Sequence, residues 1–261
     1  MKKKTLGIII VSVLGAAAIF CSAMFTHQYL DAKNSKAAFD DLTNLITEID
    51  EPQKDAEAEE ADLSTEELAA AEAALAHEKY DALFEQNNDF IGWIKIDGTN
   101  VNYPVMQTPN KPDFYLKHSF DKSYSDYGVP YIDEACMTGI SNNLVIYGHH
   151  MNDGSMFASI CNYGKQEYYD AHPVMYLNTP TQNYRVELFT GFITSADSSV
   201  YTFFFNSDAE YGAFLEKMKG FSDFDCDVEV GPEDRIITLS TCTYEYDNAR
   251  YVVMGKLVPI D

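Results

Sequence analysis

The chain is poor in positive charge. Its 261 residues include 18 lysines and arginines against 41 aspartates and glutamates, so the formal net charge at pH 7 is −23. Because nucleic-acid binding needs a basic face for the phosphates, this balance argues against a nucleic-acid partner. Arginine is especially scarce, and all three arginines, Arg185, Arg235 and Arg250, lie in the last third of the chain. Two of them flank Cys242, so we expect a specific role for at least one.

Cysteine is also sparse, and its spacing shows no tight cluster. The five cysteines are Cys21, Cys136, Cys161, Cys226 and Cys242, and no two form a CxxC pair. The last four have the number needed for two disulfides in an exported protein. A chain of this length can bury a core without a disulfide scaffold, so we interpret most of the cysteines as free thiols.

Long apolar runs are absent except at the N-terminus. Three lysines at positions 2–4 precede an uncharged stretch from Thr5 to Met24. A stretch of about 20 apolar residues matches the thickness of a bilayer, and the positive end is expected to stay in the cytoplasm. We therefore predict a cytoplasmic tail at 1–4 and a transmembrane anchor at 5–27, with the remainder of the chain outside the cell.

Two other kinds of N-terminal segment share some of these features. A cleaved signal peptide has an apolar region of about 7–15 residues, which is shorter than the run found here. Lipoprotein processing at Cys21 would require a small residue before the cysteine, and Phe20 stands there. We favour an uncleaved anchor over both alternatives.

The segment after the anchor is acidic and poor in aromatic residues. Ser64 and Glu67 match a capping box, and Leu63 and Leu68 match a hydrophobic staple, so we predict a helix that runs to about Phe84. Charge of this density favours a solvated segment over a packed core. Residues 28–79 are therefore predicted to be an acidic helical stalk or spacer.

After Asn87 the sequence becomes rich in β-favouring residues and turns. Between 207 and 220 the apolar residues share one helical face, which predicts a helix there. Many short strands with one or two inserted helices are typical of a closed or partly closed β-barrel. The expected strands are 90–96, 101–105, 143–148, 183–194, 200–205, 228–230, 235–242 and 250–258.

Two of these predicted strands bring a thiol close to a guanidinium. Cys242 ends one strand and Arg250 begins the next, and a cation beside a cysteine favours the thiolate or holds an oxyanion. His149 and His150 follow another strand and precede a turn, where catalytic residues often lie. Taken singly, Cys242 also fits a structural core cysteine and His149 a hydrogen-bonded loop histidine. Adjacent histidines cannot easily bind one metal ion, and no second cluster supports a metal site.

The motifs taken together resemble those of the sortases, and of class B sortases in particular. The resemblance rests on Tyr-Gly-His-His-Met at 147–151, Thr-Leu-Ser-Thr-Cys at 238–242 and Arg250. Further segments at 88–94, 102–107, 114–116 and 154–157 are similar to class B segments in the expected order. The resemblance extends from about Tyr80 to the C-terminus.

This resemblance implies a fold that is mostly β with added helices. The expected fold is a sortase-like closed eight-stranded β-barrel, with N-terminal helices and a helix in the loop between the sixth and seventh strands. Residues 80–261 would form the extracellular catalytic domain, tethered to the membrane by the N-terminal anchor. The predicted helix at 207–220 would be the one that walls the substrate groove.

The resemblance also implies a role for individual residues. Cys242 would be the nucleophile, His149 the general acid and base, and Arg250 the residue that positions substrate and steadies the oxyanion. The implied reaction cleaves a sorting signal after its threonine and passes through a thioacyl-enzyme. The positions implied to contact substrate are Ser240, Leu116, Val200, Tyr201 and Thr243.

The implied partners are surface proteins that carry a sorting signal, an acceptor amine and the lipid bilayer. The amine would come from a peptidoglycan precursor or from a pilin lysine. Class B sortases do not depend on calcium, so we predict no metal and no cofactor. The loop between Cys242 and Arg250 is short and the segment 110–113 matches only loosely, so the preferred sorting motif stays open.

Two other functions fit parts of the sequence. A papain-like or wall-cleaving cysteine peptidase usually places its cysteine before its histidine and on a helix, whereas here His149 comes first and Cys242 ends a strand. A membrane-anchored binding or adhesion domain would keep Cys242 structural and distant from His149 and Arg250. Convergence of these three residues at one place would favour the enzyme.

Overall fold

The N-terminal part of the protein is a long helix. The structure, a computed structural model, describes residues 2–50 and 80–260, and it divides into one unit that ends at Asp41 and another that begins at Leu42. Helix α1 (Lys2–Asp50) contains the segment Gly7–Ile46, which is long and apolar enough to cross a membrane. No other helix among the described residues meets that condition. The helix is compatible with the predicted single-pass anchor.

The predicted capping box at Ser64 and Glu67 lies outside the described residues. Residues 80–86 are helical, as expected for the end of the predicted helix near Phe84. The domain boundaries at 27 and 79, and the role of the acidic stalk, stay predictions.

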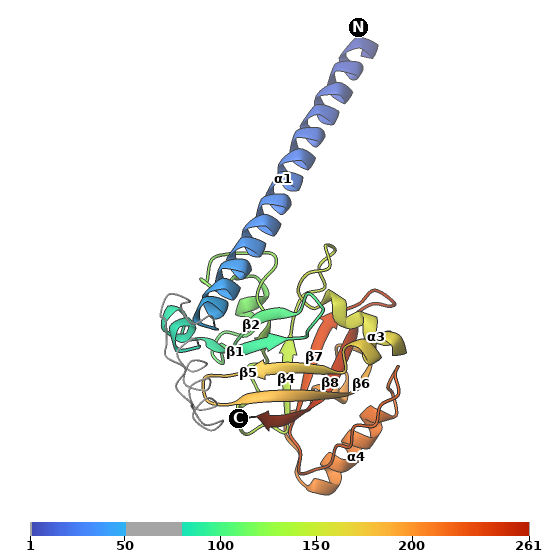
Figure 1. The fold of residues 1–261 in the computed structure, drawn as a ribbon. Coiled ribbons are helices and arrows are strands. Elements are labelled where there is room, and N and C mark those ends of the chain that lie inside the picture. The colour runs from blue at the N-terminus through green and yellow to red at the C-terminus, as the bar shows by residue number, and fades with distance from the viewer. Residues whose placement is uncertain (1, 51–79, 261) are drawn as a thin grey trace. The chain divides into compact units, whose positions relative to one another are not determined.

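The second unit is a closed β-barrel of eight strands (Figure 1). The strands are hydrogen-bonded in the order β1-β2-β3-β4-β7-β8-β6-β5, and β5 pairs with β1 to close the barrel. This architecture confirms the predicted fold class. The strands are β1 (Phe90–Lys95), β2 (Asn102–Met106), β3 (Tyr131–Ile132), β4 (Asn143–Tyr147), β5 (Val174–Asn178), β6 (Asn183–Ser195), β7 (Ile236–Cys242) and β8 (Ala249–Ile260).

Strand β7 lies between β4 and β8, which run in opposite directions to each other. It pairs in parallel with β4 and antiparallel with β8. Its residues from Ile236 to Thr241 are all buried, so the strand contains only apolar residues and small hydroxyl residues. The C-terminal ends of β4 and β7 and the N-terminal end of β8 therefore meet at one edge of the barrel.

Helix α4 (Asp208–Lys219) lies in the loop between β6 and β7, as predicted. It begins after Ser207, whose hydroxyl accepts a hydrogen bond from the Glu210 backbone nitrogen at 3.2 Å. Its apolar face packs against side chains of β6, β7 and β8, and this packing fixes the helix on the barrel. The four residues predicted to share that face, Tyr211, Phe214, Leu215 and Met218, are all buried.

The predicted strand at 200–205 is wrong. Residues Ser199–Tyr201 form a short 3-10 helix, η3, and no strand follows it. Asn143 explains the difference, because its side-chain nitrogen donates to the Val200 and Thr202 carbonyls at 3.0 and 3.2 Å. These carbonyls are satisfied by a side chain and do not join a ladder.

The predicted strand at 228–230 is also wrong, since this segment has no regular secondary structure. Val228 and Val230 pack against the cluster beneath α4, so their apolar alternation reflects side-chain packing and not strand pairing. The sequence prediction also missed five elements, the first of which is the 3-10 helix η1 (Phe114–Leu116). The other four are β3, β5, the short helix α3 (Gln166–Ala171) and the 3-10 helix η2 (Ala158–Gly164).

Asn143 offers a test of how the loop at 199–202 is held. Its side chain is fully buried and also accepts a hydrogen bond from the Thr238 hydroxyl at 2.7 Å. Asn143→Ala leaves two carbonyls and one hydroxyl without partners, and we expect a loss of about 2–4 kcal/mol in unfolding free energy, measured by denaturant titration.

Asn142→Ala is the matched control, because the side chain of Asn142 is only partly buried. We expect it to change the unfolding free energy by less than about 0.5 kcal/mol. An equal loss in both variants would show that the Asn143 hydrogen bonds do not support the loop.

Candidate active site

The three predicted catalytic residues lie at one edge of the barrel. Cys242 ends β7 and is the register partner of Arg250 on β8. Tyr147, the last residue of β4, is the register partner of Ser240, and His149 follows two positions later. Because β4 and β7 are parallel neighbours, the histidine and the cysteine leave their strands at the same edge (Figure 1). An adhesion domain with a purely structural cysteine would not require this convergence.

Hydrogen bonds tie the histidine segment to the strand of Cys242. The Gly148 nitrogen donates to the Ser240 carbonyl at 3.1 Å, and the Thr241 hydroxyl donates to the Gly148 carbonyl at 2.8 Å. Only glycine fits at 148, because a Cβ atom there would lie 2.5 Å from the ring of Phe157. The segment that carries His149 is thus held close against β7.

The ring of His149 has one nitrogen already engaged. Its Nε2 lies 2.7 Å from the Leu116 carbonyl oxygen, which can only accept, so Nε2 carries the proton. Burial lowers the pKa of His149 from its usual 6.5, the Leu116 hydrogen bond opposes that change, and the nearby Lys117 cation adds to it. At neutral pH the ring is therefore uncharged, with Nδ1 free to accept a proton.

Arg250 supplies positive charge at this edge. One guanidinium nitrogen donates to the Ala249 carbonyl at 3.0 Å, and no carboxylate among the described residues forms an ion pair with it. Tyr201 lies within range of this charge. Burial raises the pKa of Tyr201, whereas a hydrogen bond from Ser240 and the charge of Arg250 lower it. The guanidinium is thus available for a ligand at the site.

The residues predicted to contact substrate differ in their burial and in their distance from the site. The Ser240 hydroxyl lies 2.9 Å from the Tyr201 hydroxyl, which joins η3 to the end of β7. Leu116 is half-buried and reaches the site through its carbonyl on His149. Thr243 is nearly buried and donates to Glu245. The Val200 side chain is fully buried in the cluster beneath α4, so it faces the core in this structure.

Sequence reasoning named His150 beside His149 but gave it no role, and it missed Cys161 at this site. His150 Nδ1 lies 2.9 Å from the Cys242 carbonyl oxygen, and Cys161 Sγ lies 3.5 Å from the same nitrogen. The position of His150 next to His149 was visible in the sequence, but adjacency does not tell which ring faces the cysteine. Cys161 lies on η2, a helix that was not predicted, so no sequence signal placed it here.

The cysteines are all free thiols in the structure. Burial raises the pKa of Cys161 to about 11 and that of Cys136 to about 12, so both are protonated at neutral pH. No group of three His, Cys, Asp or Glu side chains within residues 2–50 and 80–260 is arranged to hold a metal ion.

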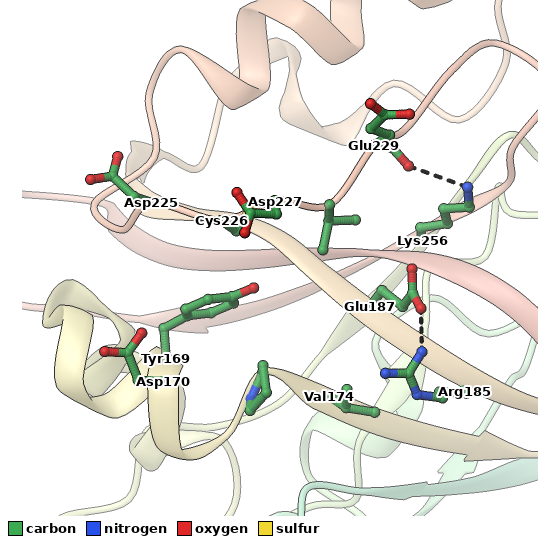
Figure 2. Close-up of a pocket in the computed structure, with 12 residues that line it drawn as sticks. Tyr169, Asp170, Val174, Arg185, Glu187, Asp225, Cys226, Asp227, Glu229 and Lys256 are labelled. Atoms are coloured by element: carbon green, nitrogen blue, oxygen red, sulfur yellow. Dashed lines mark hydrogen bonds and ion pairs between the residues drawn. The ribbon is translucent and has the colours of Figure 1, made fainter.

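A cavity of about 780 Å³ lies away from this edge (Figure 2). It is lined by residues of α3, β5, β6, β8 and the segment 225–229. The structure describes all the residues predicted for the catalytic site, and none of them lines this cavity. Arg185 pairs with Glu187, and Lys256 reaches the Glu229 carbonyl at 3.2 Å. Lys256 lies six positions after Arg250 on β8, which is roughly 20 Å along an extended strand.

Comparison with known proteins gives one consistent family. The model of the sortase domain matches residues 94–258. Sortase B of Staphylococcus aureus is 30% identical over 217 residues, which cover 82% of this chain and 88% of that protein. Sortase B of Listeria monocytogenes is 35% identical over 175 residues, which cover 66% of this chain and 71% of that protein. The solved Staphylococcus aureus sortase B–substrate complex has a TM-score of 0.75 at 26% identity, covering 89% of this chain and 100% of that one.

The lowered pKa of His149 makes a testable prediction. The folded protein binds the His149 proton less readily than the unfolded chain, so the unfolding free energy should fall as pH decreases below 6.5. In His149→Gln, which keeps an amide donor for Leu116, this part of the pH dependence should disappear. NMR titration of the His149 ring measures the pKa directly, and a value at or above 6.5 would contradict the effect of burial.

Proposed function

Because the chain belongs to the sortase family, and within it to the class B sortases, we propose that Cys242, His149 and Arg250 carry out its cysteine transpeptidation. Family membership supports a cysteine transpeptidase that anchors proteins to the cell wall. The observation that carries the assignment of residues is the register pair of Cys242 and Arg250 beside the end of β4.

The first half of the proposed reaction forms a thioacyl-enzyme. The Cys242 thiol passes its proton to Nδ1 of His149, and the sulfur attacks the threonine carbonyl carbon of a sorting signal. Arg250 donates to the oxyanion that forms as the C–S bond is made. The intermediate collapses when the C–N bond breaks, and His149 returns the proton to the leaving amine.

The second half transfers the acyl group to an amine. A neutral primary amine attacks the thioester carbonyl, gives up a proton to His149, and forms a new C–N bond. The C–S bond then breaks, and the Cys242 thiolate takes back the proton. The product amide replaces the one that was cleaved, so the exchange needs no external energy source.

The substrates follow from the same proposal. The sorting signal is cleaved after threonine, and the acceptor is an amine of a peptidoglycan precursor or a pilin lysine. In this proposal Ser240 and Tyr201, whose hydroxyls lie 2.9 Å apart, contact the sorting signal beside the nucleophile, and Leu116 and Thr243 contact it at the borders of the site. The helix α1 anchors the enzyme in the membrane, with the barrel on the outer side where its substrates emerge.

The enzyme assignment is tested with a sorting peptide whose threonine precedes glycine or asparagine. Cys242→Ala should abolish cleavage, because it removes the proposed nucleophile, and burial keeps the neighbouring Cys161 thiol protonated by raising its pKa to about 11. Arg250→Lys should lower kcat by roughly 100-fold or more, because lysine lacks the forked donor geometry of the guanidinium. Both effects are measured as single-turnover and steady-state cleavage rates.

Arg235→Lys is the matched control for Arg250. Arg235 precedes the opposite end of β7, where its Nε donates to the Ser141 carbonyl at 3.0 Å. We expect the control to keep a kcat within about twofold of the wild type. Near-normal turnover in Arg250→Lys would refute the oxyanion role. A wild-type protein that cleaves no sorting peptide and retains Cys242 unmodified would favour the adhesion domain instead.

A further inference from the structure

We propose that His150 is a positioning residue that sets the separation of Cys242 and His149. This inference rests on the proposed roles of those two residues and adds to them a group that touches neither substrate nor the reacting sulfur. It acts through the backbone carbonyl of the nucleophile, from the residue next to the acid–base histidine.

The hydrogen bond from His150 continues a ladder that the backbone has left. The Gly148 nitrogen donates to the Ser240 carbonyl, and the next β7 carbonyl on that side belongs to Cys242, two positions on. Strand β4 ends at Tyr147, so the backbone of 150 does not supply the donor. Instead the His150 ring reaches the Cys242 carbonyl, with Nδ1 at 2.9 Å.

The contact also identifies the protonated nitrogen of His150. A carbonyl oxygen only accepts, so Nδ1 must carry a hydrogen in both the neutral and the charged ring. The Cys161 sulfur, 3.5 Å from the same nitrogen, is then a second acceptor at longer range. One donor atom thus faces the backbone of the nucleophile at a fixed distance.

His150 is held both through its backbone and through its ring. Its backbone forms an isolated β-bridge with Met156, and the ring meets the edge of Tyr244 with centroids 5.5 Å apart. The neighbouring Phe157 nitrogen donates to the His149 carbonyl at 2.9 Å. The bond from His150 to Cys242 therefore joins two segments that are each held by their own hydrogen bonds, and it sets the distance between them.

The result is that His149 lies between two residues bonded to the nucleophile strand. Gly148 is bonded to Ser240 and Thr241, and His150 is bonded to Cys242. A proton passes between His149 and Cys242 only at a defined separation, so loss of the second bond should lower kcat and leave peptide binding unchanged.

The test compares three variants of His150, each made in the full-length chain and assayed in a membrane or in detergent. His150→Ala and His150→Leu remove the donor, and we expect kcat to fall by about five- to tenfold with KM within about twofold. His150→Asn places an amide nitrogen close to the position of Nδ1 and should restore kcat to within about twofold of the wild type. Melting temperatures identify any variant that fails to fold.

His172→Ala is the matched control, since His172 Nδ1 lies 2.8 Å from the Asp97 carbonyl and away from the site. It should leave kcat unchanged. The proposal is overturned if all His150 variants turn over at the wild-type rate, if the asparagine variant is as slow as the alanine variant, or if the control slows equally.

A second readout separates this inference from the proposed function. Alkylation of Cys242 by iodoacetamide, followed by peptide mass spectrometry, needs no sorting signal. It should slow by about the same factor in His150→Ala and recover in His150→Asn. A wild-type enzyme that cleaves no peptide would refute the proposed function, whereas equal alkylation rates in all variants would refute the role of His150.

Discussion

The parallel pairing of β4 with β7 is the constraint on which the site depends. An antiparallel β4 would place His149 at the other end of the strand, roughly 17 Å from Cys242 for a strand of five residues. The antiparallel hairpin of β7 and β8 then adds Arg250 opposite Cys242. A barrel with both kinds of pairing therefore brings together groups that lie about ninety residues apart in the chain.

Of the two basic side chains His149 and Arg250, only the Arg250 guanidinium is charged near neutral pH. Burial lowers the pKa of His149, so its ring is neutral near pH 7, whereas a guanidinium stays charged throughout this range. The protein carries a formal net charge of −23, yet no carboxylate among its described residues pairs with Arg250. The guanidinium therefore has no ion-pair partner among the described residues, and the neutral His149 ring is able to accept a proton.

The sequence predicted the parts of the fold that depend on local pattern. The long strands β6, β7 and β8 were found because each contains a run of β-favouring residues, and the helix α4 because its buried residues share one helical face. Strand β3 has two residues, too few for any periodic signal. The segment 200–205 was misread because Asn143, far away in sequence, takes its carbonyls. Ordered motifs named Cys242, His149 and Arg250, which the strand pairing places at one edge of the barrel. The direction of the His150 ring depends instead on where β4 ends.

Two hydroxyls on one face of β7 join the strand of Cys242 to the segment around η3. Thr238 and Ser240 are two positions apart, so their side chains point the same way. Thr238 bonds Asn143, which holds the carbonyls around η3, and Ser240 bonds the Tyr201 hydroxyl. Because both residues are nearly or fully buried, these bonds persist without water competing for them. A displacement of Tyr201 would therefore break a hydrogen bond to the strand that ends at Cys242.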